Sequence, residues 1–152
     1  MTAPGRHVLT GVRSDAAVRS NVGVVNISAT STNFIITTFD ADGVELASVS
    51  KRVRSFSMSQ WNLEQLGVAT LSTPGRVEIV IDPDTVDWDP CDLDINNLDL
   101  DTVLFLSYAS RIDQATSDAE FQPGQSDWSA YQDLCGTSPG LTGVGPRFSF
   151  HD

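Results

Sequence analysis

The chain has 152 residues, of which 40% are hydrophobic, and its 20 acidic residues against nine Lys plus Arg give a net charge of −11 at pH 7. That length fits one domain, 1–152, because a chain of this size buries about two thirds of its unfolded surface. The charge excludes a nucleic-acid partner, since phosphate backbones are bound by clustered Lys and Arg. No apolar run approaches the roughly 18 residues of a membrane span, so no membrane span is expected.

Short runs rich in β-branched and aromatic residues fill most of the sequence, and turn residues separate them. Such runs, at intervals of about eight to twelve residues, predict strands rather than helices. The predicted strands, in chain order, are His7–Val12, Ser20–Ser28, Asn33–Asp40, Val44–Ser50, Lys51–Ser59, Arg76–Asp82, Thr102–Arg111 and Arg147–His151.

In two of these runs, one kind of side chain clearly recurs at every second position. In Ser20–Ser28, the side chains of Val22, Val24 and Asn26 share one face, and Arg76–Asp82 repeats the pattern with aliphatic residues at 77, 79 and 81. The segment Thr102–Arg111 is the most apolar, and both of its faces are largely nonpolar, which predicts a central strand.

Turn signals support the same architecture. Asp42-Gly43 between two strand-like runs predicts a hairpin. Asn62, Gln65 and Gly67 supply an N-cap, its reciprocal partner and a terminal glycine, which predicts one short helical turn. We therefore expect an all-β fold, a single β-sandwich of jelly-roll or immunoglobulin-like type with roughly seven to nine mostly antiparallel strands.

The acidity is local. The segment 82–101 contains eight aspartates and no basic residue, and it is interpreted as an acidic loop insertion into a nearly neutral sandwich. The Gly, Ser and Pro-rich tail 124–146 is expected to form a loop that leads into a terminal strand, 147–151.

Part of the acidic insertion has the alternating Asp and Asn side chains that Ca²⁺ binds through their oxygens. An EF-hand is excluded, because its sixth and twelfth positions hold Asn97 and Val103 instead of glycine and glutamate. Two interpretations stay open: an irregular calcium site, with Ca²⁺ as the one possible cofactor, or a solvated acidic loop without any cofactor. The candidate metal ligands are Asp92, Asp94, Asn96, Asp99 and Asp101.

The two cysteines, Cys91 and Cys135, lie in Pro, Gly, Asp and Ser-rich surroundings, which favours a disulfide over two unrelated buried thiols. Such a bridge closes a loop of about 45 residues and stabilises the fold by about 4 kcal/mol. If the cysteines pair, Trp88, Trp128 and Tyr131 can form one aromatic patch. That patch is either a carbohydrate-binding surface or a small satellite core.

Nothing in the sequence forms a catalytic constellation, so we expect no enzyme. Gly136–Gly140 matches the G-x-S-x-G nucleophile pattern, but Pro139 has no N–H to donate to an oxyanion. The only histidines, His7 and His151, lie near opposite ends of the chain and are expected at the surface.

Four short motifs resemble a β-sandwich module that recurs in large secreted bacterial proteins. Arg19–Asn26 reads R-x-N-x-G-x-x-N, Asp40–Gly43 reads D-x-D-G, Tyr108–Asp113 reads Y-A-S-x-x-D and Phe121–Pro123 reads F-x-P. The resemblance covers Val12–Pro123, and the acidic insertion and the tail depart from it. It implies a noncatalytic accessory or surface domain.

Together these observations predict a noncatalytic structural or adhesive module, extracellular or on the cell surface after removal of any targeting segment. The expected partner is a protein, and self-assembly through edge strands or the terminal segments Thr2–Val12 and Arg147–Asp152 is one route to it. The alternative is a carbohydrate-binding module, with or without a structural calcium ion.

Overall fold

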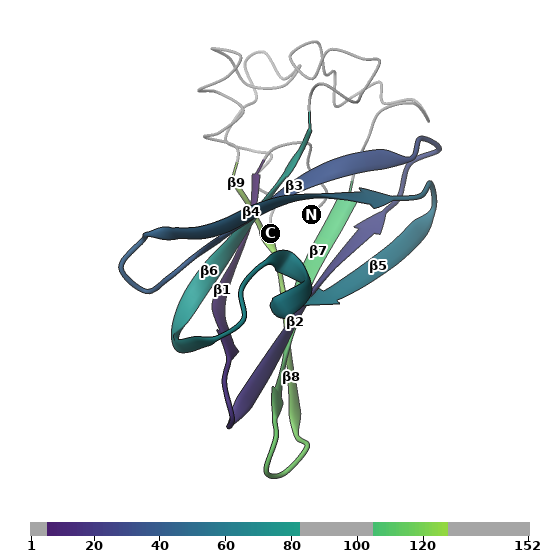
Figure 1. The fold of residues 1–152 in the computed structure, drawn as a ribbon. Coiled ribbons are helices and arrows are strands. Elements are labelled where there is room, and N and C mark those ends of the chain that lie inside the picture. The colour runs from purple at the N-terminus through teal and green to yellow at the C-terminus, as the bar shows by residue number, and fades with distance from the viewer. Residues whose placement is uncertain (1–5, 83–104, 128–152) are drawn as a thin grey trace, which may run out of the picture.

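The structure is a computed structural model that describes residues 6–82 and 105–127 (Figure 1). The described residues form nine strands, all paired antiparallel, and one turn of 3-10 helix. The predictions of an all-β fold and of a short helical turn are confirmed. The elements are β1 (Arg6–Ser14), β2 (Val18–Asn26), β3 (Thr32–Phe39), β4 (Glu45–Val53), β5 (Ser57–Asn62), η1 (Glu64–Leu66), β6 (Leu71–Ile81), β7 (Phe105–Asp113), β8 (Ala119–Pro123) and β9 (Gln125–Asp127).

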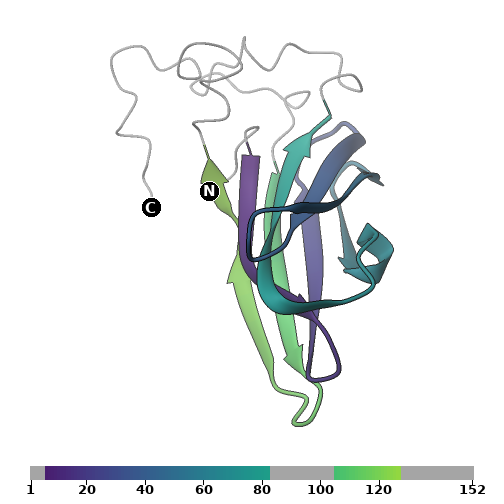
Figure 2. The same cartoon turned by 60° about the vertical axis from the view of Figure 1, so that its left-hand side comes forward.

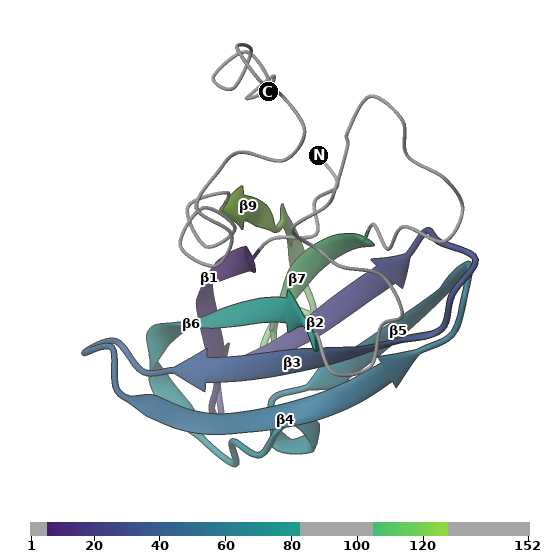
Figure 3. The ribbon, with the colours of Figure 1, turned by 90° about the horizontal axis from the view of Figure 1, so that it is seen from above.

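The strands form one continuous sheet that folds over into two layers (Figures 2 and 3). β1 and β2 pair only beside the turn that joins them, where Ser14 pairs with Arg19. Beyond that pair the two strands diverge into different layers. The β4 layer has the order β4-β3-β6-β1, and the β5 layer has the order β5-β2-β7-β8. Because β9 continues from β8 and pairs with β1, the two layers are joined a second time along that side.

The core lies between the layers and is built largely by side chains that alternate along the strands. Phe34 of the β4 layer meets Phe105 of the β5 layer edge to face, with 4.9 Å between ring centroids. The residues predicted to share one face of β2, Val22, Val24 and Asn26, and one face of β6, at 77, 79 and 81, are all buried, so these faces point into the core. The largest fully buried side chains include Phe34, Phe105, Leu9, Ile36, Leu63, Leu66 and Ile79.

η1 fills the open side of the sandwich, where it contacts the edge strands β4 and β5. The predicted capping is confirmed: the Gln65 N–H donates to Asn62 Oδ1 at 2.8 Å, and the Asn62 N–H donates to Gln65 Oε1 at 2.9 Å. Gly67 ends the turn at φ 93°, and a Cβ atom there would stand 3.1 Å from Ala47 Cβ. Leu63 and Leu66 are thereby held in the core.

One strand prediction was wrong in detail. Lys51–Ser59 is not one strand, because Phe56 adopts a positive φ of 51° that separates β4 from β5. The prediction of a central strand within Thr102–Arg111 is confirmed, because β7 pairs with β2 and with β8. Its outward face is not covered, since Leu106 is 41% exposed.

The expected loop after residue 124 was also wrong at its start, because Gln125–Asp127 forms β9. The rest of the acidic insertion (83–101), the rest of the tail (128–146) and the predicted terminal strand (147–151) lie outside the described residues. Among the helices of the described residues, none is long and apolar enough to cross a membrane.

Candidate functional site

The residues predicted to carry chemistry all lie outside the described ranges, so their roles stay predictions. In the described part of the chain, no group of three or more His, Cys, Asp or Glu side chains is placed to hold a metal ion. The residues concerned are Asp92, Asp94, Asn96, Asp99, Asp101, Cys91, Cys135, Trp88, Trp128 and Tyr131.

His7 is not at the surface, contrary to expectation. It is 1% exposed, its ring stacks on Phe105 with 3.8 Å between centroids, and its Nδ1 lies 2.8 Å from Ser107 Oγ. The sequence carried a signal for this position, because His7 shares the inward face of β1 with Leu9. His7 therefore belongs to the core between the layers.

The outward side of the β5 layer is the first candidate site. Cross-strand register places Met58, Val25 and Leu106 in one row, and Gln60, Gly23 and Tyr108 in the next. Five of the seven large hydrophobic side chains that are exposed among the described residues belong to these strands or to the residues directly beside them. The outer apolar face, as we call it, consists of Ile27, Phe56, Met58, Leu106, Tyr108 and Phe121.

Tyr108 organises this face. Its ring lies against Gly23, where a Cβ atom would stand 2.1 Å from Tyr108 Cζ. Its hydroxyl reaches β5, donates to Gln60 Oε1 at 2.7 Å and lies 3.4 Å from Met58 Sδ. Phe121 of β8 stacks with the Tyr108 ring, with 5.0 Å between centroids. Desolvation raises the pKa of Tyr108, so the neutral phenol is favoured.

The outer apolar face carries no charge. Outward positions on β2 hold Asn21, Gly23 and Val25, and the first charged one is Arg19, at the hairpin end of the strand. The opposite surface, on the β4 layer, is charged. There Glu78 forms an ion pair with Arg76 at 2.8 Å, and the Arg76 guanidinium lies 4.1 Å from the centroid of the Phe39 ring. An uncharged apolar surface on a chain of net charge −11 favours an apolar partner.

The second candidate site is a pocket of about 270 Å³ where β1 parts from β8. We call it the seam pocket. Gly11 adopts φ 75° at an irregular register between β1 and β6, which bends β1 at this point. The pocket is lined by Thr10, Gly11, Val12, Ser20, Ala109, Arg111, Glu120, Phe121 and Gln122.

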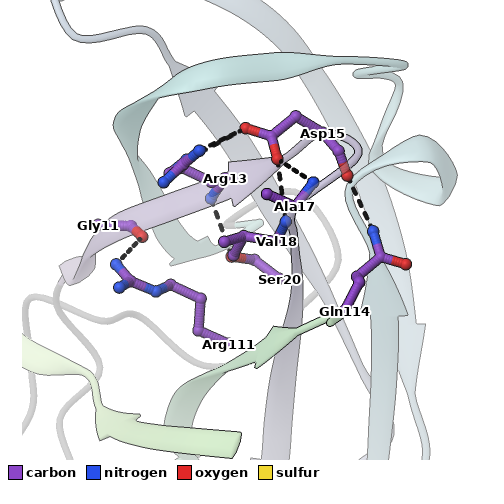
Figure 4. A network of polar contacts seen from close by, with 8 residues as sticks. All are labelled: Gly11, Arg13, Asp15, Ala17, Val18, Ser20, Arg111 and Gln114. Atoms are coloured by element: carbon purple, nitrogen blue, oxygen red, sulfur yellow. Dashed lines mark hydrogen bonds and ion pairs between the residues drawn. The ribbon is translucent and has the colours of Figure 1, made fainter. Parts of the chain in front are cut away.

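The β1–β2 turn beside the seam pocket is fixed by Asp15 (Figure 4). Asp15 Oδ2 accepts from Arg13 Nη2 at 2.6 Å, and its Oδ1 accepts the N–H groups of Ala17 at 2.8 Å and Val18 at 2.9 Å. These bonds, with the Arg13 bond first, lower the pKa of Asp15. The side chain of Gln114 donates to the Asp15 carbonyl at 2.8 Å and ties the turn to the end of β7.

Asn26 begins the sequence Asn-Ile-Ser, which matches the acceptor pattern for N-glycosylation. In the structure it is fully buried, and its amide nitrogen donates to the carbonyls of Thr30 at 2.9 Å and Val53 at 3.2 Å. Its Oδ1 accepts from Ser28 Oγ at 2.7 Å. Asn26 is therefore a structural residue that joins the end of β2 to β4.

No family model matches the chain, and no curated protein matches it. Among solved structures, it is similar to the crystal structure of Thermotoga maritima 1070, with a TM-score of 0.58 and 11% sequence identity. The alignment covers 84% of this chain and 97% of the Thermotoga maritima chain. At that identity the similarity concerns the fold alone.

Proposed function

We propose that this chain is a noncatalytic structural or adhesive β-sandwich module of the cell surface or the extracellular space. It acts by self-association through the outer apolar face. The observation that carries the proposal is the concentration of exposed hydrophobic side chains on one uncharged sheet surface. The resemblance of its motifs to a module of secreted bacterial proteins supports the location.

The net charge of the chain favours a second copy as the partner that binds the outer apolar face. Each copy carries −11, so two copies repel wherever their acidic surfaces approach. The outer apolar face lets them meet without opposing charges. A two-fold axis through it pairs the same surface on both copies, and two sheet faces pack well at about 10 Å.

The area of the outer apolar face sets the affinity that we expect between two copies. Four strands spaced by about 4.8 Å and seven residues rising about 3.3 Å each span roughly 19 by 23 Å. That footprint of roughly 440 Å² is about half of the 800 Å² that each partner contributes to a standard interface. We therefore expect weak pairwise association, which suits modules that act in many copies.

Sedimentation velocity over a concentration series tests the proposal. Raising NaCl from about 0.1 M to about 1 M shortens the Debye length from about 10 Å to about 3 Å, which screens the repulsion between acidic copies. We expect the weight-average sedimentation coefficient to rise with protein concentration and to rise further at high salt. A monomer at every concentration and both salt levels contradicts self-association.

The second candidate function is carbohydrate binding on the same face. It is favoured by the flat Tyr108 ring next to the outward amide side chains of Asn21, Gln60 and Asn62. Glycan-array binding that is lost in Tyr108→Ala and kept in Leu46→Ala, which changes the other layer, supports this function. An array without any binding rejects it.

A further inference from the structure

The seam pocket exists because β1 loses its partner on one side. β9 pairs with β1 only at residues 6–8, and β8, before Gly124, pairs with β7 alone. Among the described strands, none pairs with Thr10 or Val12 on that side. Two side chains span the gap instead: Gln122 Nε2 donates to Thr10 Oγ1 at 3.0 Å, and Arg111 Nη1 donates to the Gly11 carbonyl at 3.4 Å.

Among the described residues that line this pocket, Arg111 has the only cationic side chain. Its bond to Gly11 is near the outer limit of hydrogen-bond length, and its ion pair with Glu120 is 3.7 Å long. Glu120 is 78% exposed at its side chain, so water weakens that pair. Among the described residues, Arg111 therefore keeps most of its five N–H donors for another acceptor.

Arg13, on β1, provides a comparison, because its guanidinium is held firmly by a carboxylate. Its Nη2 and Nε donate to the same Asp15 oxygen at 2.6 Å and 3.2 Å. The two arginines therefore differ: Arg13 fixes a turn through short bonds, whereas Arg111 is positioned by one long bond to the Gly11 carbonyl (Figure 4).

The other lining residues indicate the size and polarity of a ligand that fits the seam pocket. Val12 and Ala109 form an apolar floor and are buried, whereas Thr10 and Gln122 offer a hydroxyl and an amide. A volume of about 270 Å³ lies below the usual range of roughly 300 to 1,000 Å³ for drug-sized ligands, so the ligand is small. A planar guanidinium fork matches a carboxylate in bidentate geometry.

We propose that the seam pocket binds a small organic carboxylate, whose carboxylate group contacts Arg111 and whose carbon skeleton lies on Val12 and Ala109. Binding displaces the weak contact with Glu120, and hydroxyl groups of the ligand contact Thr10 and Gln122. The carboxylate can belong to a free acid or to the C-terminus of a peptide. This site differs from the outer apolar face, and the two share only Phe121.

The test is a ¹H–¹⁵N NMR titration of the full chain with D-glucuronate and with D-glucose, which has a similar size but no carboxylate. A tripeptide with a free C-terminus and its C-terminal amide form the second pair of ligands. We expect saturable shifts at the amides of Gly11 and Val12 with at least one carboxylate ligand at up to about 20 mM, and none with its neutral counterpart. Binding by glucuronate indicates a free acid, and binding by the peptide alone indicates a chain end. Equal binding of the charged and neutral members, or no binding by either acid, overturns the proposal.

Three variants and a control sharpen the test. Arg111→Gln should weaken binding by about tenfold or more, and Arg111→Lys by less, because lysine keeps the charge and loses the fork. Glu120→Gln should strengthen binding, because it removes the competing carboxylate from an exposed position that the fold does not need. Arg52→Gln makes the same charge change as Arg111→Gln on the other layer and should leave affinity unchanged. Unchanged affinity in Glu120→Gln, or equal losses in Arg111→Gln and Arg52→Gln, contradicts the assignment.

Discussion

The ring of Tyr108 occupies the space that a side chain at Gly23 would fill. The two residues are directly paired on neighbouring strands, β7 and β2, and a Cβ atom on Gly23 would stand 2.1 Å from Tyr108 Cζ. The missing side chain lets the tyrosine cross β2 and reach Gln60 on β5 at 2.7 Å. The outer apolar face thus depends on a glycine as much as on its aromatic residues.

Gly23→Ala should destabilise the fold by about 1 to 3 kcal/mol, because the new methyl group displaces the Tyr108 ring. In a Tyr108→Ala background the same change should be nearly neutral, since the space is then empty. Urea unfolding of the four proteins in this double-mutant cycle measures the coupling. Equal losses in both backgrounds would show that the ring does not depend on Gly23.

Asn26→Ala should cost about 2 to 3 kcal/mol of unfolding free energy. It removes the buried amide that donates to the Thr30 and Val53 carbonyls and the oxygen that accepts from Ser28 Oγ. The Thr30 carbonyl keeps other donors, the hydroxyls of Ser28 and Thr32. Asn33→Ala is the matched control. Its side chain accepts one exposed bond from Arg52 at 3.3 Å, so its removal should change stability by less than about 0.5 kcal/mol. Similar losses in the two variants would contradict the structural role of Asn26.

The Asp15 carboxylate should make stability depend on pH. Its pKa in the folded state is lowered below 3.8, so its contribution is fully present above that value and is lost as pH falls through the folded pKa. The wild type should therefore be more stable than Asp15→Asn at pH 7, and the difference should shrink toward zero in strong acid. Urea midpoints measured at both pH values test this.

Asp42→Asn is the matched control, because it removes the same carboxylate from another turn. No hydrogen bond to the Asp42 carboxylate occurs within the described residues, so this variant should match the wild type at neutral pH. A wild-type advantage over Asp15→Asn that persists at the lowest pH would rule out the Asp15 carboxylate as its source.

Phe56 should lower the stability of the fold and promote self-association. It is 66% exposed and holds a left-handed conformation, with φ 51°, that asparagine adopts more easily. Phe56→Asn should raise stability by about 0.5 to 1 kcal/mol and weaken self-association, because it relieves strain and removes part of the outer apolar face. Met58→Asn, which relieves no strain, should weaken association without the gain in stability. Thermal unfolding separates the two, and a loss of stability in Phe56→Asn would refute the strain argument.

The local patterns of the sequence predicted those parts of the fold that depend on local chemistry. Alternation placed Val22 and Val24 on one face of their strand, and that face is buried. Asn62 with Gln65 predicted the helical turn with its two reciprocal bonds. The Asp42-Gly43 hairpin also forms, with Gly43 at φ 82° and the Asp42 N–H donating to Asp40 Oδ1. Each of these features is decided within a few residues of chain.

The candidate sites could not be predicted in this way, because they arise from register between distant strands. Nothing near Gly23 indicates that it faces Tyr108, and the seam pocket needs β1 and β8 to part. Gly11 was the available signal, since an isolated glycine within a strand pattern often marks a bulge. The strand break at Phe56 had no such signal, because phenylalanine rarely adopts a positive φ.

Two leucines, one on each layer, distinguish self-association through the outer apolar face from association through another surface. Leu106 on that face is 41% exposed, and Leu46 on the other layer is 40% exposed, so a change to glutamate alters charge and exposed area equally at both positions. In sedimentation equilibrium, we expect Leu106→Glu to remain monomeric at concentrations where the wild type and Leu46→Glu associate. Association of Leu106→Glu as strong as that of Leu46→Glu would contradict self-association through the outer apolar face.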